Sequence, residues 1–271
     1  MQNIFLEVNS LDRRCYEEFE LSEDILMENA AKSIAEHIKK KFDKGSRVLI
    51  VAGSGNNGAD GITLARILHG DFSVGLYIPN ALKSPISSLQ IKRANSVGIE
   101  IITKIEVCDV LVDALFGSGL SRKIDKSTAE IINKMNSIDS YKIACDVPSG
   151  IRADGLVSEH TFKADITLTM GGLKLSLYGD MAKDYVGEIE VCDLGISREI
   201  YEIKSTISLL DKSDLTLPHR VKKSTHKGEF GHLSVICGRK IGASVIASRC
   251  GFTLWSRLGY SHKPWKCTYT L

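Results

Sequence analysis

The sequence lacks the segments that would send a protein out of the cell or anchor it to a membrane. None of its apolar runs approaches the length needed to cross a bilayer. The first residues, Met1–Glu7, have neither the basic start nor the apolar stretch of a signal peptide. Charge is balanced too, because the formal net charge is +2 and the basic residues are spread along the chain. We therefore expect a cytoplasmic protein whose partners include neither nucleic acid nor a membrane.

Cysteine pairs with metal-binding or redox spacing are missing as well. The seven cysteines are scattered, and no Cys-x-x-Cys motif occurs. This indicates small buried side chains in a reducing compartment, not a zinc site or a disulfide framework. No repeat of fixed period is visible. The 271 residues suffice for a sizeable core, as one large domain or one and a half.

What the sequence does contain is an alternation of apolar strands and helices. The run Val48–Ala52 suits a strand buried on both faces. An amphipathic helix is expected after its N-cap Ser22, with Lys39–Lys41 at its C-terminal end and Gly45 closing it. Further strands are expected at Phe72–Ile78, Ile99–Ile102, Val110–Asp113, Tyr141–Asp146, Ile166–Thr169 and Glu188–Cys192, and helices at Pro85–Val97 and Lys126–Met135. The alternation predicts an α/β fold with a largely parallel sheet and helices on both faces.

A glycine-rich turn, Gly53–Gly61, follows the first of these strands and precedes a helical pattern. This order of elements aims backbone N–H groups at a phosphate on a helix N-terminus, and the glycines match G-x-G-x-x-G. The next strand, however, ends at Pro79-Asn80 without the acid that holds the ribose in ordinary dinucleotide sites. Asn56, Asn57 and Asp60 make the turn unusual, although turns also accept Asn and Asp for backbone reasons alone.

Polar residues follow three of the expected strands, at the edge where such sheets bind ligands. Backbone amides around Gly117–Leu120 could hold a second phosphate. Oxygens of Asn57, Asp113 and Ser149 suit a hard cation, and a single acid among them favours a monovalent ion. Asp146 then stays free for proton transfer, with burial expected to raise its pKa. The alternative is that such acids only form turns.

Four motifs occur in this order along the chain: Met27–Ala31, Gly53–Gly61, Val112–Leu120 and Asp146–Gly150. Together they resemble the YjeF N-terminal family, the NAD(P)H-hydrate epimerases, over about residues 1–210. The resemblance implies a Rossmann-like three-layer sandwich, usually dimeric. It also implies interconversion of the R and S epimers of hydrated NADH and NADPH (NADHX and NADPHX), a repair of nicotinamide nucleotides.

The resemblance also assigns residues to the site. By the family pattern Asn57, Asp113 and Ser149 hold potassium (K+), and the proton-transfer group Asp146 also contacts the nucleotide. The other implied substrate contacts are Asn56, Asn57, Gly58, Ala59, Asp60, Gly117, Ser118, Gly119, Leu120, Ser121, Arg122 and Lys123. Ala59 departs from the glycine usual in the family, which would strain the turn if the backbone there needed a positive φ.

The end of the chain has a different character. His226–Gly238, continuing to Ser248, resembles the opening of the ADP- or ATP-dependent NAD(P)H-hydrate dehydratase, a ribokinase-like domain. We expect residues 1–210 to be the epimerase domain, 211–253 a truncated start of the dehydratase, and 254–271 an aberrant tail. The hypothesis is a frameshift or early stop in a once bifunctional gene, with dehydratase activity lost; a natural short tail is the alternative.

Three function classes are compared. The first is the epimerase, and the second is a non-catalytic nucleotide- or metabolite-binding module on the same fold. A free acid, Asp146, beside an ion site favours the enzyme, because a module that only binds has no need of it. An NAD-dependent dehydrogenase comes last, because it would need the missing ribose acid.

Overall fold

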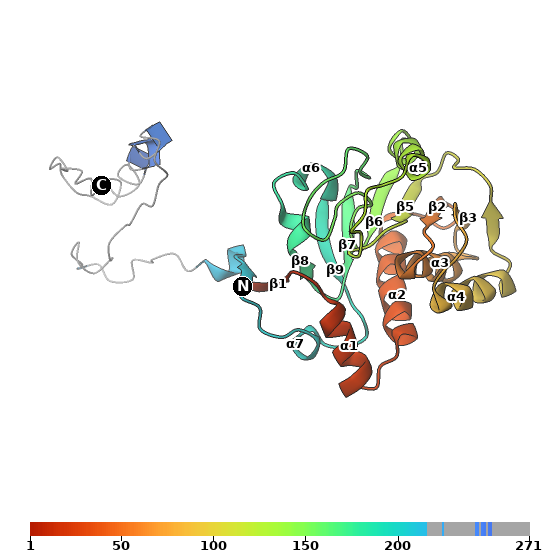
Figure 1. Cartoon of the computed structure of the whole chain (residues 1–271), viewed down its shortest axis with the longest axis horizontal. Helices are drawn as coiled ribbons and strands as arrows, with labels where there is room; N and C mark the ends of the chain where they lie inside the picture. The colour runs from red at the N-terminus through yellow and green to blue at the C-terminus, as the bar shows by residue number, and fades with distance from the viewer. Residues whose placement is uncertain (216–223, 225–241, 244, 248, 251–271) are drawn as a thin grey trace. The chain divides into compact units, whose positions relative to one another are not determined.

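The computed structural model describes residues 1–215, 224, 242–243, 245–247 and 249–250. The chain divides into two units, Met1–Asp214 and Leu215–Leu271, and the first holds everything analysed below. The tail expected at 254–271, and most of the dehydratase-like segment expected at 211–253, lie outside the described residues, drawn as a grey trace in Figure 1.

The first unit is built on a seven-stranded sheet in the order β4-β3-β2-β5-β6-β7-β9, with every neighbouring pair parallel. Its strands are β2 (Arg47–Ala52), β3 (Ser73–Tyr77), β4 (Glu100–Ile102), β5 (Val110–Ala114), β6 (Tyr141–Cys145), β7 (Ile166–Met170) and β9 (Glu188–Cys192). The chain runs outward from β2 to β4 and then returns to the other side of β2 as β5. This reversal is the switch point where open α/β sheets bind ligands.

Helices cover both faces of this sheet (Figure 1). α2 (Glu23–Lys41), α3 (Asn56–Leu68) and α4 (Pro85–Ser96) pack on one face, and α5 (Lys126–Asn136) packs on the other. The predicted Rossmann-like three-layer sandwich is thus confirmed.

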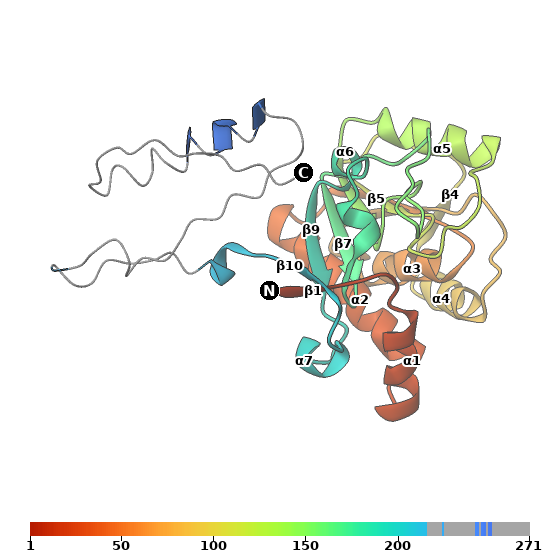
Figure 2. The same cartoon turned by 60° about the vertical axis from the view of Figure 1, so that its left-hand side comes forward.

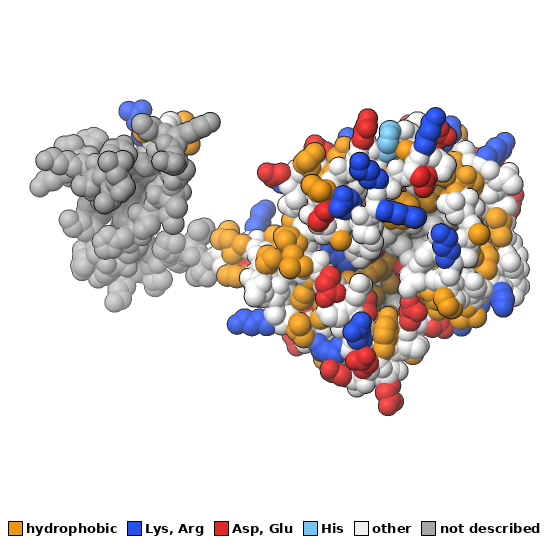
Figure 3. All heavy atoms as spheres, viewed as in Figure 1, with side chains coloured by type: hydrophobic (Ala, Val, Ile, Leu, Met, Phe, Trp, Pro, Cys, Tyr) orange, Lys and Arg blue, Asp and Glu red, His pale blue; other side chains and the backbone are white. Residues whose placement is uncertain are grey.

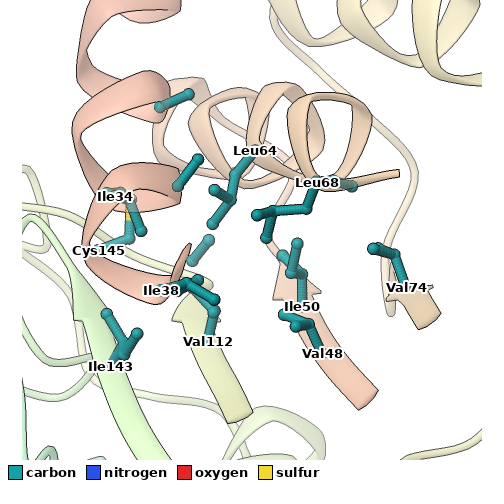
Figure 4. Close-up of a cluster of buried hydrophobic side chains, with 14 of the residues drawn as sticks. Ile34, Ile38, Val48, Ile50, Leu64, Leu68, Val74, Val112, Ile143 and Cys145 are labelled. Carbon is teal, nitrogen blue, oxygen red and sulfur yellow. The ribbon is translucent and has the colours of Figure 1, made fainter. Parts of the chain in front are cut away.

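Alternating side chains of β2 build the two halves of the core. Val48, Ile50 and Ala52 face α2 and α3, whereas Leu49 and Val51 face α5. Figure 4 shows the first half, where helix side chains meet strand side chains; those labelled include Ile34, Ile38, Leu64, Leu68, Val112 and Ile143. Burying each such side chain stabilises the fold by about 1.5–3 kcal/mol. The strand ends that carry polar residues therefore project from a fixed platform.

A second, three-stranded sheet was not anticipated. It consists of β10 (Ile207–Leu209), β1 (Gln2–Phe5) and β8 (Leu173–Lys174), with β1 antiparallel to β10 and parallel to β8. Figure 2 shows β1 beside β10 and leading into α1 (Asn9–Glu18). The remaining elements are η1 (Leu175–Tyr178), α6 (Lys183–Val186), α7 (Arg198–Tyr201) and η2 (Lys212–Asp214). Leu11 and Cys15 of α1 pack with Leu26 of α2, which fixes α1 beside the main sheet.

Two local predictions need correction. Ser22 does precede α2, but its side chain makes no capping hydrogen bond. The helix ends at Lys41, and Gly45 lies in the following turn at φ +89°, where its N–H bonds the carbonyl of Asp71. Gly45 therefore shapes the approach to β2 and does not close the helix.

Three further features of the described residues concern apolar length, cysteine and charge. None of the helices described is both long and apolar enough to span a membrane. Cys15, Cys108, Cys145 and Cys192 are buried free thiols. On the face drawn in Figure 3, basic and acidic side chains of the first unit are interspersed.

Candidate active site

A cavity of about 680 Å³ lies at the switch point, beyond the carboxyl ends of β2 and β5. Its lining includes the start of α3, the loop after β5, the first turns of α2, Asp146 after β6, and α1, which the sequence analysis did not place here. The polar and charged lining residues are Asn9, Asp12, Arg13, Tyr16, Glu23, Ser54, Asn56, Asn57, Asp60, Ser118, Ser121, Arg122 and Asp146. Most of the predicted substrate contacts thus come together.

The glycine-rich turn is shaped by close backbone contacts. A Cβ atom on Gly53 would lie 2.0 Å from the carbonyl oxygen of Leu115, and one on Gly58 would lie 1.9 Å from that of Gly53. α3 begins at Asn56, so the polar residues predicted for a loop occupy the first turns of a helix instead. Ala59 sits in this helix without a positive φ, so the strain considered for it does not arise.

Asp146 follows β6 and is held by several donors. Its carboxylate forms an ion pair with Lys174 at 2.7 Å and accepts hydrogen bonds from the backbone N–H groups of Ser118 (2.8 Å) and Met170 (3.2 Å). Its backbone has φ +72°, a region that residues with a side chain rarely adopt. A Cβ atom on Gly117 would lie 2.8 Å from the Asp146 carboxylate. The loop after β5 therefore packs closely against the Asp146 carboxylate.

The pKa of Asp146 moves opposite to the sequence-based expectation. Burial does favour the neutral acid, but the charge of Lys174 and the hydrogen bonds to the carboxylate outweigh burial and hold the pKa below its ordinary value. The prediction of a raised pKa was wrong because it left out Lys174. That lysine is 1% exposed and also donates to Thr169 Oγ1 and the Met170 carbonyl. One signal was present: Lys174 is the only charged residue in Leu173–Leu177.

Asp60 lies in the same cavity with the opposite electrostatics. Burial raises its pKa well above the ordinary value, and the negative charges of Asp146, Asp12 and Glu23 raise it further. The cavity therefore holds two acids whose pKa values are shifted in opposite directions, that of Asp146 downward and that of Asp60 upward. Two carboxyl groups whose environments separate their pKa values are a typical arrangement for acid–base chemistry.

The residues predicted to hold potassium lie around the start of the loop after β5. Asp113 is fully buried and accepts hydrogen bonds from Ser149 N and Oγ, both at 2.7 Å, and from Leu115 N at 3.1 Å. Burial raises its pKa to about 6 despite these bonds. Asn57 lies against Gly117, and its buried Nδ2 atom has no hydrogen-bond partner among the residues that the structure describes.

This donor set suits a monovalent cation. Nowhere in the described part of the chain do three His, Cys, Asp or Glu residues gather as a metal site. Carboxylate, hydroxyl and amide oxygens are instead the ligands that hard cations take. A cation there would offset the charge of Asp113, with which no described basic side chain forms an ion pair.

The remaining predicted contacts lie in, behind or outside the cavity lining. Gly117, Gly119 and Leu120 line the cavity together with Ser118 and Ser121. Gly58 and Ala59 are buried behind the lining and shape it, while Lys123 is exposed and lies outside the lining.

Comparisons with known proteins give a family match and several relatives. Residues 23–176 match the family described as YjeF-related protein N-terminus. The chain is 42% identical over 255 residues to the bifunctional NAD(P)H-hydrate repair enzyme Nnr of Helicobacter pylori, covering 92% of this chain and 54% of that one. It is 33% identical over 213 residues to the NAD(P)H-hydrate epimerase of Elusimicrobium minutum, covering 72% and 95%.

The fold has a counterpart among solved structures. The crystal structure of yeast ynu0, YNL200c, matches with a TM-score of 0.60 at 18% identity, over 70% of this chain and 87% of that one. The chain spans about half the length of the bifunctional relatives that it matches.

Proposed function

Since the chain belongs to the family of the YjeF-related protein N-terminus, we propose that its first domain, residues 1–210, is an NAD(P)H-hydrate epimerase. It interconverts the R and S epimers of NADHX and NADPHX. The observation that carries the proposal is the Asp146–Lys174 ion pair in the cavity at the switch point, with the acid Asp60 beside it.

The chemistry assigns separate roles to the two acids. The reacting carbon, C6, carries a hydroxyl beside the ring nitrogen, and losing water gives an iminium-like species that water can attack from the other face. Asp60, whose pKa is raised by burial and by the neighbouring carboxylates, protonates the leaving hydroxyl. The ionised Asp146 takes the proton from the entering water, and Lys174 holds its carboxylate in place. The hydrate thus loses one water and regains one, with no net change in oxidation.

Potassium is the proposed cofactor. Asn57, Asp113 and Ser149 would hold it, and it would supply positive charge beside the substrate-binding loop. Support comes from the buried charge of Asp113.

The cellular setting belongs to the same proposal. A cytoplasmic location is supported by the free thiols of the described cysteines, which suit a reducing compartment. A homodimer is proposed on the resemblance to the family.

The test is epimer interconversion, followed by NMR or chromatography on purified R or S hydrate, with wild type and Asp146→Asn. We expect the wild type to equilibrate the epimers and the variant to lose about 10²–10⁴-fold in turnover while keeping most of its nucleotide affinity. If Asp146 only held a ribose hydroxyl, the variant would bind more weakly while turnover at saturating substrate stayed near wild type. Binding of the hydrate by wild type without any interconversion would indicate the non-catalytic module instead.

A further inference from the structure

A second cavity, of about 300 Å³, lies between the glycine turn, the chain after β3 and the loop after β5. Ser54, Phe116 and Arg122 line both cavities, so the two are neighbours along the turn. Asn80, Lys83 and Asp125 line the second cavity and not the first. The chemistry proposed above uses none of these three residues, although a dinucleotide has a second half to place.

The charges around the second cavity favour an anion. Within the described part of the chain, neither Lys83 nor Arg122 forms an ion pair with a carboxylate. The acid in the lining, Asp125, already accepts hydrogen bonds from Thr128 N (2.9 Å) and Ser127 Oγ (2.6 Å) as the N-cap of α5. Two cations and one acid leave a net positive charge.

The lysine is attached to the glycine turn through its backbone. The N–H of Lys83 donates to the carbonyl oxygen of Ser54 at 2.9 Å. Lys83 therefore stands next to the first turn of α3, where the pyrophosphate of a dinucleotide would lie.

The position of the second cavity relative to the sheet indicates which anion it binds. β3 is the neighbour of β2 on the side away from β5, and in dinucleotide sites the chain after that strand reads the ribose 2′ position. An acid there selects a 2′-hydroxyl, whereas a cation accommodates a 2′-phosphate. Here β3 is followed by Pro79, Asn80 and Lys83, and no acid lines the cavity from this segment.

We propose that the second cavity binds the 2′-phosphate of NADPHX, with Lys83 and Arg122 as its cationic partners. The inference rests on the proposed epimerase function and adds a preference to it: the KM for NADPHX is lower than that for NADHX.

The first test compares Lys83→Gln with wild type on both hydrates. We expect the KM for NADPHX to rise about fivefold relative to the KM for NADHX, the effect of losing one solvent-exposed charge pair. Lys92→Gln is the matched control, because Lys92 is an exposed lysine of α4 that lines neither cavity. An equal rise for both substrates would overturn the proposal, since Lys83 would then serve a group that the two share.

A binding test separates this proposal from the enzymatic one. Calorimetry with adenosine 2′,5′-bisphosphate and adenosine 5′-monophosphate needs no turnover. We expect wild type to bind the bisphosphate more tightly and Lys83→Gln to lose that preference. If the preference holds while neither hydrate is epimerised, the proposed function fails and the phosphate site stands. Equal affinities in wild type would overturn the phosphate site, whatever the activity.

Discussion

Asp146 carries two costs that its neighbours must offset. Its backbone lies at φ +72°, and the residue is only 7% exposed. Lys174 supplies the compensating charge, since its Nζ atom lies 2.7 Å from the carboxylate. Because the folded-state pKa of Asp146 lies below its ordinary value of 3.8, this interaction adds stability above pH 3.8 and loses it as the pH falls through the folded-state pKa.

Lys174→Met tests this dependence. The change leaves a buried carboxylate without its partner, so we expect the free energy of unfolding to fall by about 3–5 kcal/mol at pH 7. The pKa of Asp146 then rises, and the acidic limb of the pH–rate profile moves to higher pH. Denaturant unfolding and kcat against pH measure the two effects. Lys183→Met, which removes an exposed ion pair with Asp180, is the control and should leave stability nearly unchanged. Similar losses in both variants would contradict a special role for Lys174.

Single residues mark where sequence reasoning was limited. Asp146 could be singled out because it closes an apolar strand before a Pro-Ser-Gly turn. The direction of its pKa could not, because Lys174 reaches it from β8, a strand of two residues with no period to detect. A carboxylate's titration depends on whichever charge is nearest, and that distance is a property of the folded chain.

At the scale of elements, α3 and the turn before it decide the shape of the site. The long parallel strands were predictable because each is a continuous apolar run between helical segments. β1, β8 and β10 were missed because two to four residues carry too little alternation. Because these strands were not predicted, α1 was not placed at the cavity. Asp12 and Tyr16 were therefore missing from the expected cavity wall.

Gly58 provides a test of this element. Gly58→Ala places a Cβ atom 1.9 Å from the carbonyl oxygen of Gly53, so turn and helix must separate. We expect a loss of about 1–3 kcal/mol in unfolding free energy, as for other overpacked sites, together with weaker nucleotide binding. Gly55→Ala is the control, because a Cβ atom there meets nothing within 4 Å and the residue has φ −101°. Thermal unfolding and a nucleotide titration compare the two. Equal stability of both variants would mean that the turn has room the structure does not indicate.

Over the whole first unit, the site depends on three strand ends meeting at one edge. β2 pairs with β5 and β5 with β6, so Asn57 after β2, Asp113 at the end of β5 and Ser149 after β6 lie at neighbouring strand ends. The sequence does not show the order of the strands in the sheet. The carboxyl ends of parallel strands nevertheless lie at one edge, so these three residues were expected to come close together. A cation bound by all three residues would link these strand ends, and binding to the folded state alone stabilises the whole unit.

Potassium therefore predicts a measurable shift in stability. At ten times its dissociation constant, an ion that binds only the folded protein adds about 1.4 kcal/mol. We expect thermal unfolding to occur at higher temperature in potassium than in tetramethylammonium at equal ionic strength, and Ser149→Ala to lose most of that difference. Ser149 is the variant of choice because Asp113 accepts three hydrogen bonds that its removal would leave unmade. Ser137→Ala, at the end of α5, is the control, since its hydroxyl bonds only the Lys134 carbonyl. If wild type and Ser149→Ala responded equally to potassium, Ser149 would not be a ligand, and the charge of Asp113 would need another partner.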